Sequence, residues 1–217
     1  MAAQAGVAHM NHAAIRPDAE FDEGDVADLR AAPRYTLLIR AAKLISPQGE
    51  FVCVIRDVSS TGVSVRLFHP LPQCDPIALE LRSGEIYKIE RRWEREGEAG
   101  FQFSAPVNVE HLVAEVGQFP KRGLRLGVEF PIAVKTLTLR RDATIKNISQ
   151  QGARIECDAL LAIDQTVRIE SKEIPEVRAK IRWRRDRDYG LVFDDTFTLG
   201  DFAKLAVRLQ CPTLLQG

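Results

Sequence analysis

The 217-residue chain repeats itself at an offset of ninety residues, and this repeat limits its possible folds more than any other feature. The segment IRDVSSTGVSV (55–65) aligns with IKNISQQGARI (145–155). The same offset places Trp93 on Trp183 and Phe103 on Phe193. An internal repeat indicates the architecture of a chain more strongly than a single motif does. Because the same offset holds for all of residues 55–103, the sequence predicts two copies of one domain.

Each copy is rich in short segments with the alternation and β-branched residues of antiparallel strands. In the first copy these segments are RYTLLIRAAKLI, FVCVIRDV, VSVRLF, PIALELR, YKIERRW and GFQFS, with turn residues in SPQGE and SSTG. In the second copy, TVRIES, VRAKIRWRR and YGLVF repeat the pattern. Apolar residues spaced three and four apart predict a helix in VEHLVAEVGQF (109–119) and another in LGDFAKLAVRL (199–209).

Closure into a barrel removes the unpaired edges that a single antiparallel sheet would leave open. The sequence therefore predicts a mainly β fold of two tandem six-stranded antiparallel β-barrels, each followed by an α-helix. We expect residues 30–119 to form the first barrel with a connector helix, and residues 120–217 the second barrel with a C-terminal helix. Residues 1–29 differ in kind, because six acidic residues lie between Arg16 and Leu29 with little apolar periodicity, and we interpret them as a flexible acidic leader.

The composition excludes several classes of function. Lys plus Arg and Asp plus Glu both number 30, which gives no overall attraction for nucleic acid. The chain has no apolar run of membrane-spanning length and no secretory signal pattern, so we expect a cytoplasmic protein. The four cysteines are far apart, which indicates neither a disulfide framework nor a metal site. No histidine has a repeatable Ser or Cys partner, so we expect no enzyme activity and no cofactor.

Two arginines precede the first predicted strand. Arg30 and Arg34 are four residues apart, and Pro33 between them disfavours a helix, so we expect a loop. Two guanidinium groups on a loop can converge on one anion, and each can donate paired hydrogen bonds to phosphate or lie flat on an aromatic ring. The alternative is a pair of solvated arginines that contribute little.

The segment DVSSTG follows at a predicted strand end. Asp57 and Ser59 alternate with Val58, so their side chains emerge on one face, and Gly62 is expected to permit a turn that other residues resist. A fixed carboxylate can accept the adjacent N–H donors on the Watson–Crick edge of guanine. Asp, Ser and Gly are also ordinary turn formers, so the motif alone is a weak signal. It indicates a nucleotide site only together with the arginines upstream.

RAAPR (30–34), followed by DVSSTG (57–62), a tryptophan and a YGLVF-like strand, resembles the PilZ family of bacterial cyclic di-GMP receptors. The family pattern is RxxxR and [D/N]xSxxG. The resemblance implies a six-stranded barrel with a C-terminal helix and an arginine loop that wraps the ligand against the barrel. It further implies that Arg30 and Arg34 hold the phosphates and stack on guanine. Asp57 and Ser59 would read guanine edges, and Gly62 would shape the turn.

The second copy departs from this pattern. FPKRGLR offers Arg122 and Arg125 with only two residues between them, or Lys121 and Arg125 at the family spacing. NISQQG keeps the motif as Asn147, Ser149 and Gly152. A neutral amide accepts guanine's donors less strongly than a carboxylate. We therefore expect either a weaker second site or a barrel that has become structural or partner-binding.

The function predicted from these features is a cyclic di-GMP receptor without an output domain. Ligand would order the arginine loop and change binding to a protein effector partner. One alternative is an interaction module that no longer binds nucleotide. The other is a single-stranded nucleic-acid binder, since ERRWERE and IRWRRDR mix basic and aromatic residues. We interpret Trp93 and Trp183 as core residues, which disfavours that alternative.

Overall fold

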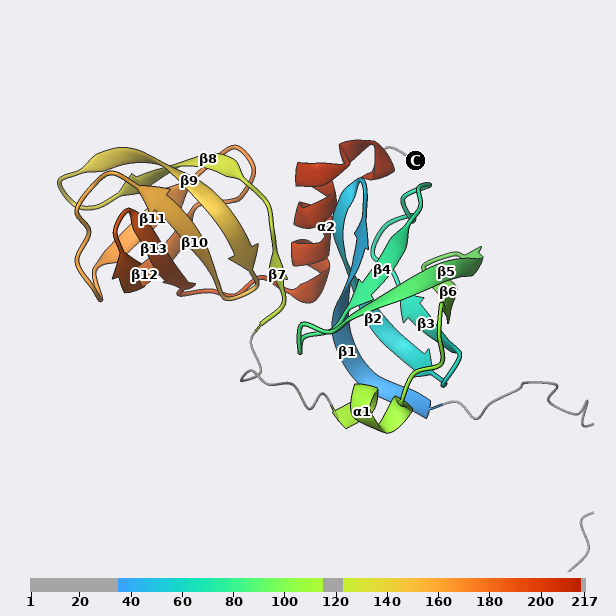
Figure 1. Ribbon diagram of the computed structural model, residues 1–217. Helices are drawn as coiled ribbons and strands as arrows, with labels where there is room; N and C mark the ends of the chain where they lie inside the picture. The colour runs from blue at the N-terminus through green and yellow to red at the C-terminus, as the bar shows by residue number, and fades with distance from the viewer. Residues whose placement is uncertain (1–34, 115–122, 216–217) are drawn as a thin grey trace, which may run out of the picture. The chain divides into compact units, whose positions relative to one another are not determined.

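The computed structural model describes residues 35–114 and 123–215 (Figure 1). The first half forms a closed antiparallel barrel with the strand order β1-β2-β3-β6-β5-β4. Its strands are β1 (Tyr35–Ser46), β2 (Gly49–Val58), β3 (Gly62–Arg66), β4 (Ile77–Glu80), β5 (Ile86–Arg95) and β6 (Glu98–Phe103). A short helix, α1 (Val109–Ala114), follows the barrel.

The second half repeats this topology. The strands pair in the order β10-β13-β12-β11-β8-β9, and the additional pairing of β10 with β9 closes the barrel. A two-residue strand, β7 (Arg125–Leu126), is added beside β9. The barrel strands are β8 (Phe130–Lys135), β9 (Arg140–Ser149), β10 (Gly152–Cys157), β11 (Thr166–Glu170), β12 (Val177–Arg185) and β13 (Asp188–Phe193). Helix α2 (Leu199–Gln210) follows, and a 3-10 turn, η1, spans Pro212–Leu215. The predicted pair of six-stranded barrels, each followed by a helix, is confirmed.

Apolar side chains that the strands direct inward build the two cores. In β12, Val177, Ala179 and Ile181 point inward and are buried, while the basic residues between them are exposed. Phe51, Ile55 and Leu79 belong to the buried cluster of the first barrel. Val167, Ile169 and Tyr189 belong to the cluster of the second. The basic residues of β12 therefore lie on the solvent side of the sheet.

Helix α2 contributes to both clusters. Phe202 and Leu205 are buried with the second barrel, whereas Val207 is buried with the first. At its end, the Gln210 amide donates from Nε2 to the carbonyl oxygen of Glu50 at 2.8 Å, and Gln210 Oε1 accepts from the Glu50 backbone N–H at 2.8 Å. Both barrels belong to one compact unit of the chain.

The tryptophans lie on the outside of the barrels, so their interpretation as core residues is wrong. Trp183 is 41% exposed, and Trp93 is half-buried. The pairing register shifts between Arg91 and Trp93 in β5, and between Ile181 and Trp183 in β12. Such a bulge adds one residue to the strand and reverses the alternation after it. Each tryptophan is therefore turned from the inner face to the outer face.

No helix in the described ranges is both long and apolar enough to cross a membrane.

Candidate functional site

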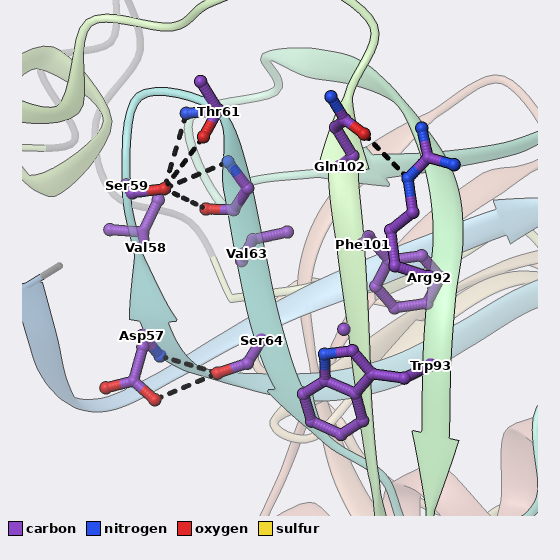
Figure 2. Close-up of a pocket in the computed structure, with 12 residues that line it drawn as sticks. Asp57, Val58, Ser59, Thr61, Val63, Ser64, Arg92, Trp93, Phe101 and Gln102 are labelled. Carbon is purple, nitrogen blue, oxygen red and sulfur yellow. Dashed lines mark hydrogen bonds between the residues drawn. The ribbon is translucent and has the colours of Figure 1, made fainter. Parts of the chain in front are cut away.

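A cavity of about 280 Å³ opens on the outer face of the first barrel. Its walls come from β2, β3, β6 and β5, which are neighbours in the sheet (Figure 2). The lining residues are Asp57, Val58, Ser59, Thr61, Gly62, Val63, Ser64, Arg92, Trp93, Gly100, Phe101 and Gln102. All three DxSxxG residues named from the sequence, Asp57, Ser59 and Gly62, therefore line one pocket.

The Asp57 carboxylate is oriented by the neighbouring strand. Asp57 pairs with Ser64 across the β2–β3 hairpin. Ser64 Oγ donates to Asp57 Oδ2 at 3.0 Å and accepts from the Asp57 backbone N–H at 3.2 Å, as Figure 2 shows. These bonds fix the direction of the carboxylate before any ligand arrives.

Ser59 holds the turn between β2 and β3. Its Oγ accepts from the backbone N–H groups of Gly62 at 3.2 Å and Thr61 at 3.4 Å. Its own backbone N–H donates to the Gly62 carbonyl at 2.8 Å. A serine that bonds its local backbone in this way stabilises a tight turn. Direct contact between the Ser59 hydroxyl and guanine stays a prediction.

Gly62 is required for a reason other than the expected one. Its φ does not lie in the left-handed region, unlike that of Gly49, Gly84 or Gly97. A Cβ at Gly62 would lie 2.9 Å from the carbonyl oxygen of Phe101 on the adjacent strand β6. The glycine therefore allows close strand approach rather than an unusual backbone conformation.

The DxSxxG and RxxxR motifs do not include the residues of the opposite wall of the pocket. This wall consists of Arg92 and Trp93 on β5, with Gln102 on β6. Arg92 Nε donates to Gln102 Oε1 at 2.7 Å. A Cβ at Gly100 would lie 2.0 Å from Trp93 Nε1, so the glycine makes room for the indole on the sheet surface. The recurring Arg-Trp and Gly pairs of the repeat were visible in the sequence, but the bulge that turns them outward was not.

Arg30 and Arg34 lie outside the described residues, as does Arg122 in the second copy. Their positions relative to the motif residues stay predictions.

In the second barrel, Arg125 and the motif residues come together. Arg125 Nη1 donates to Asn147 Oδ1 at 3.1 Å. Ser149 Oγ donates to the Gly152 carbonyl at 3.1 Å, which reproduces the serine-held turn. A Cβ at Gly152 would lie 2.0 Å from the Leu191 carbonyl oxygen, so this glycine also permits close strand approach.

The surroundings of this second motif differ from those of the first. Arg154 stands at the repeat position of Ser64, and Val192 at that of Gln102. Arg154 Nη2 donates to Asp188 Oδ2 at 2.6 Å, and this bond raises the pKa of the Arg154 guanidinium. The second barrel therefore lacks the polar side chains of Ser64 and Gln102. In their places it has an arginine that is bonded to Asp188 and an apolar valine.

Across residues 35–114 and 123–215, no His, Cys, Asp and Glu side chains gather in a group that could hold a metal ion.

Comparison with known families decides the identity of the second barrel. The model of the PilZ domain family matches residues 119–208. The chain contains a PilZ domain. The match spans the second barrel and most of α2, and it confirms the resemblance inferred from the motifs. The stretch that carries the NISQQG variant is thus the one matched by the PilZ model, whereas the first barrel shares its strand order and its repeat with this PilZ domain.

Solved structures with similarity to the chain include PlzA of Borreliella burgdorferi in complex with c-di-GMP, at 11% identity and a TM-score of 0.33, covering 79% of this chain and 88% of that one. YcgR of Escherichia coli in complex with c-di-GMP has 10% identity and a TM-score of 0.27, with coverage of 82% and 83%. The Bacillus subtilis inhibitor of motility MotI/DgrA has 12% identity and a TM-score of 0.34, with coverage of 82% and 99%. The search of curated proteins gives no match.

Proposed function

We propose that this protein is a cyclic di-GMP receptor whose main binding site is the pocket on the first barrel. The observation that carries the proposal is the Asp57 carboxylate, held by Ser64 at the edge of a cavity whose other wall presents Arg92 and Trp93. This arrangement combines a hydrogen-bond acceptor, a cation and an aromatic surface. The PilZ domain in the same chain gives the family context.

Each group has a chemical role in this proposal. The Asp57 carboxylate accepts the two adjacent N–H donors of a guanine base. The Trp93 indole, lying over Gly100, offers an aromatic surface for the base. Arg30 and Arg34 supply the forked donors that suit phosphate, and they close over the ligand from the segment before β1.

The second barrel has a weaker site in this scheme. Its residues are Arg122, Arg125, Asn147, Ser149 and Gly152. Asn147 presents an amide where the first barrel has a carboxylate, and Asn147 Oδ1 already accepts a bond from Arg125. We infer that this barrel binds cyclic di-GMP less tightly than the first barrel does.

Signalling follows from ordering of the arginine segment. Ligand binding fixes the segment against the barrel and changes the surface that a protein effector contacts. The protein acts in the cytoplasm as a regulator rather than an enzyme, and cyclic di-GMP is its ligand rather than a cofactor.

Calorimetric titration with cyclic di-GMP tests the proposal. A micromolar complex requires about 8 kcal/mol of binding free energy, and charge-assisted hydrogen bonds contribute roughly 1.5–3 kcal/mol each, so four or five contacts suffice. Arg34→Ala is expected to abolish detectable binding, because the phosphates lose one of two guanidinium forks. The matched control is Arg66→Ala, an exposed arginine on β3 that does not line the pocket.

The outcomes separate the candidate functions. Unchanged affinity in Arg34→Ala would remove the arginine pair from the site. Absence of binding by the unaltered chain would contradict the receptor proposal and favour the interaction module. A response to oligonucleotides only, weakening steeply with salt, would favour the nucleic-acid binder instead.

A further inference from the structure

The two walls of the first-barrel pocket carry opposite charges. Asp57 lies on β2 and Arg92 on β5, with β3 and β6 between them in the sheet. The floor between the walls is made of small residues, because Ser64 on β3 pairs directly with Gly100 on β6. An acceptor on β2 and a donor on β5 therefore line the same pocket. In Figure 2 the Asp57 carboxylate lies beside Ser64, and the Arg92 side chain extends toward Gln102.

The Arg92 guanidinium is held in place by two neighbours. Its Nε donates to Gln102 Oε1 at 2.7 Å, and its Nη2 donates to Glu90 Oε2 at 3.0 Å. Its remaining terminal nitrogen, Nη1, makes no hydrogen bond with the described residues. A guanidinium fixed at two nitrogens retains donors for a third partner, since arginine has five N–H groups in a rigid fork.

Guanine and adenine differ at the position that such a donor would meet. Guanine presents O6 and N7 as acceptors, whereas adenine presents an amino donor in place of O6. A carboxylate satisfies the N–H edge of guanine, and a guanidinium satisfies its O6 and N7. The same pair of groups disfavours adenine, because the adenine amino group would meet the donors of the arginine.

We propose that Arg92 determines the specificity of the first barrel for guanine over adenine, with Gln102 as its positioning residue. This inference rests on the proposed function, and it names the base that the pocket selects. Arg92 acts on the base, in contrast to Arg30 and Arg34, to which we assign the phosphates.

The second barrel provides the matched comparison. Arg182 is the repeat equivalent of Arg92, but its Nη1 donates to Asp164 Oδ1 at 3.2 Å. Val192 occupies the repeat position of Gln102 and cannot accept a hydrogen bond from it. The second barrel therefore has the arginine without the contact that positions it.

The test compares the affinities of cyclic di-GMP and cyclic di-AMP for the full chain, measured by calorimetry. The unaltered chain is expected to prefer cyclic di-GMP. Arg92→Gln is expected to reduce the ratio of the two affinities by about tenfold or more, as loss of an arginine–guanine contact predicts. Gln102→Val should reduce the ratio less, because Arg92 remains but is no longer held. Arg182→Gln should leave the ratio unchanged.

Each result has a distinct meaning. If Arg92→Gln weakens both nucleotides equally, Arg92 contributes general attraction and the specificity role is overturned. An unchanged ratio in Arg92→Gln also overturns it, provided that circular dichroism shows native melting. Failure of the unaltered chain to bind either nucleotide would instead refute the proposed function.

Discussion

At the scale of single residues, the motif glycines determine how closely adjacent strands approach. Gly62 faces the Phe101 carbonyl, and Gly152 faces the Leu191 carbonyl. In both cases the obstacle to a larger side chain is backbone, which cannot rotate away as a side chain can. The DxSxxG pattern therefore encodes both the serine-held turn and the strand contact beside it.

We predict that Gly152→Ala destabilises the protein by roughly 1–3 kcal/mol, because its Cβ would lie 2.0 Å from the Leu191 oxygen and force β10 away from β13. Thermal and urea unfolding followed by circular dichroism measure the change. The control is Gly123→Ala, where a Cβ meets nothing within 4 Å. Equal stability of the two variants would contradict the close-approach argument.

At the scale of elements, local irregularities decide what the strands and helices present. The bulges in β5 and β12 turn the tryptophans outward and bring Arg92 to the pocket wall. Helix α2 begins after Thr198, which is its N-cap residue. The Thr198 backbone is extended, and its side chain accepts a hydrogen bond from the Asp201 backbone N–H in the first turn. Asp201 in that turn also suits the positive end of the helix dipole.

Thr198→Ala is expected to lower the free energy of unfolding by about 1 kcal/mol, since Thr198 Oγ1 accepts from the Asp201 backbone N–H at 3.1 Å. Thr196→Ala, which alters an exposed threonine before the helix, serves as the control. Denaturant titration of both variants measures the difference. A loss of similar size at Thr196 would show that the effect is not due to helix capping.

At the scale of the whole molecule, the chain joins two barrels with one topology but different outer surfaces. The first presents a cavity with Asp57, Ser64 and Gln102, and the second places Arg154 and Val192 at the latter two positions. The acidic leader precedes Arg30 in the sequence and lies outside the described residues. We propose that its six acidic residues compete with the ligand phosphates for Arg30 and Arg34 at low salt.

We predict that deletion of residues 1–25 tightens cyclic di-GMP binding at low ionic strength, because five of the six acidic residues that precede Arg30 and Arg34 in the sequence are removed. Calorimetry at low and high salt measures the dissociation constants. The difference between full-length and truncated chains should shrink at high salt, as screening requires. Identical constants at low salt would dismiss the competition.

Much of the fold was readable because its signals are local or repeated. The ninety-residue offset predicted the duplication, and the alternation of apolar residues predicted the strands. The segment DVSSTG predicted the turn that Ser59 stabilises. The pocket wall formed by Arg92 and Gln102 was not readable from the motif. Its position depends on the pairing of β5 with β6 and on a one-residue bulge in β5. No local sequence pattern predicts this bulge.

By itself, the sequence determined two barrels of antiparallel strands and the motif turn in each, because side-chain period and turn chemistry act over a few neighbouring residues. Only the tertiary structure decided which residues face Asp57 across the pocket, why Gly62 must be glycine, and that α2 packs into both buried clusters. Those features arise from contacts between segments far apart in the chain, where strand register and backbone proximity set the outcome.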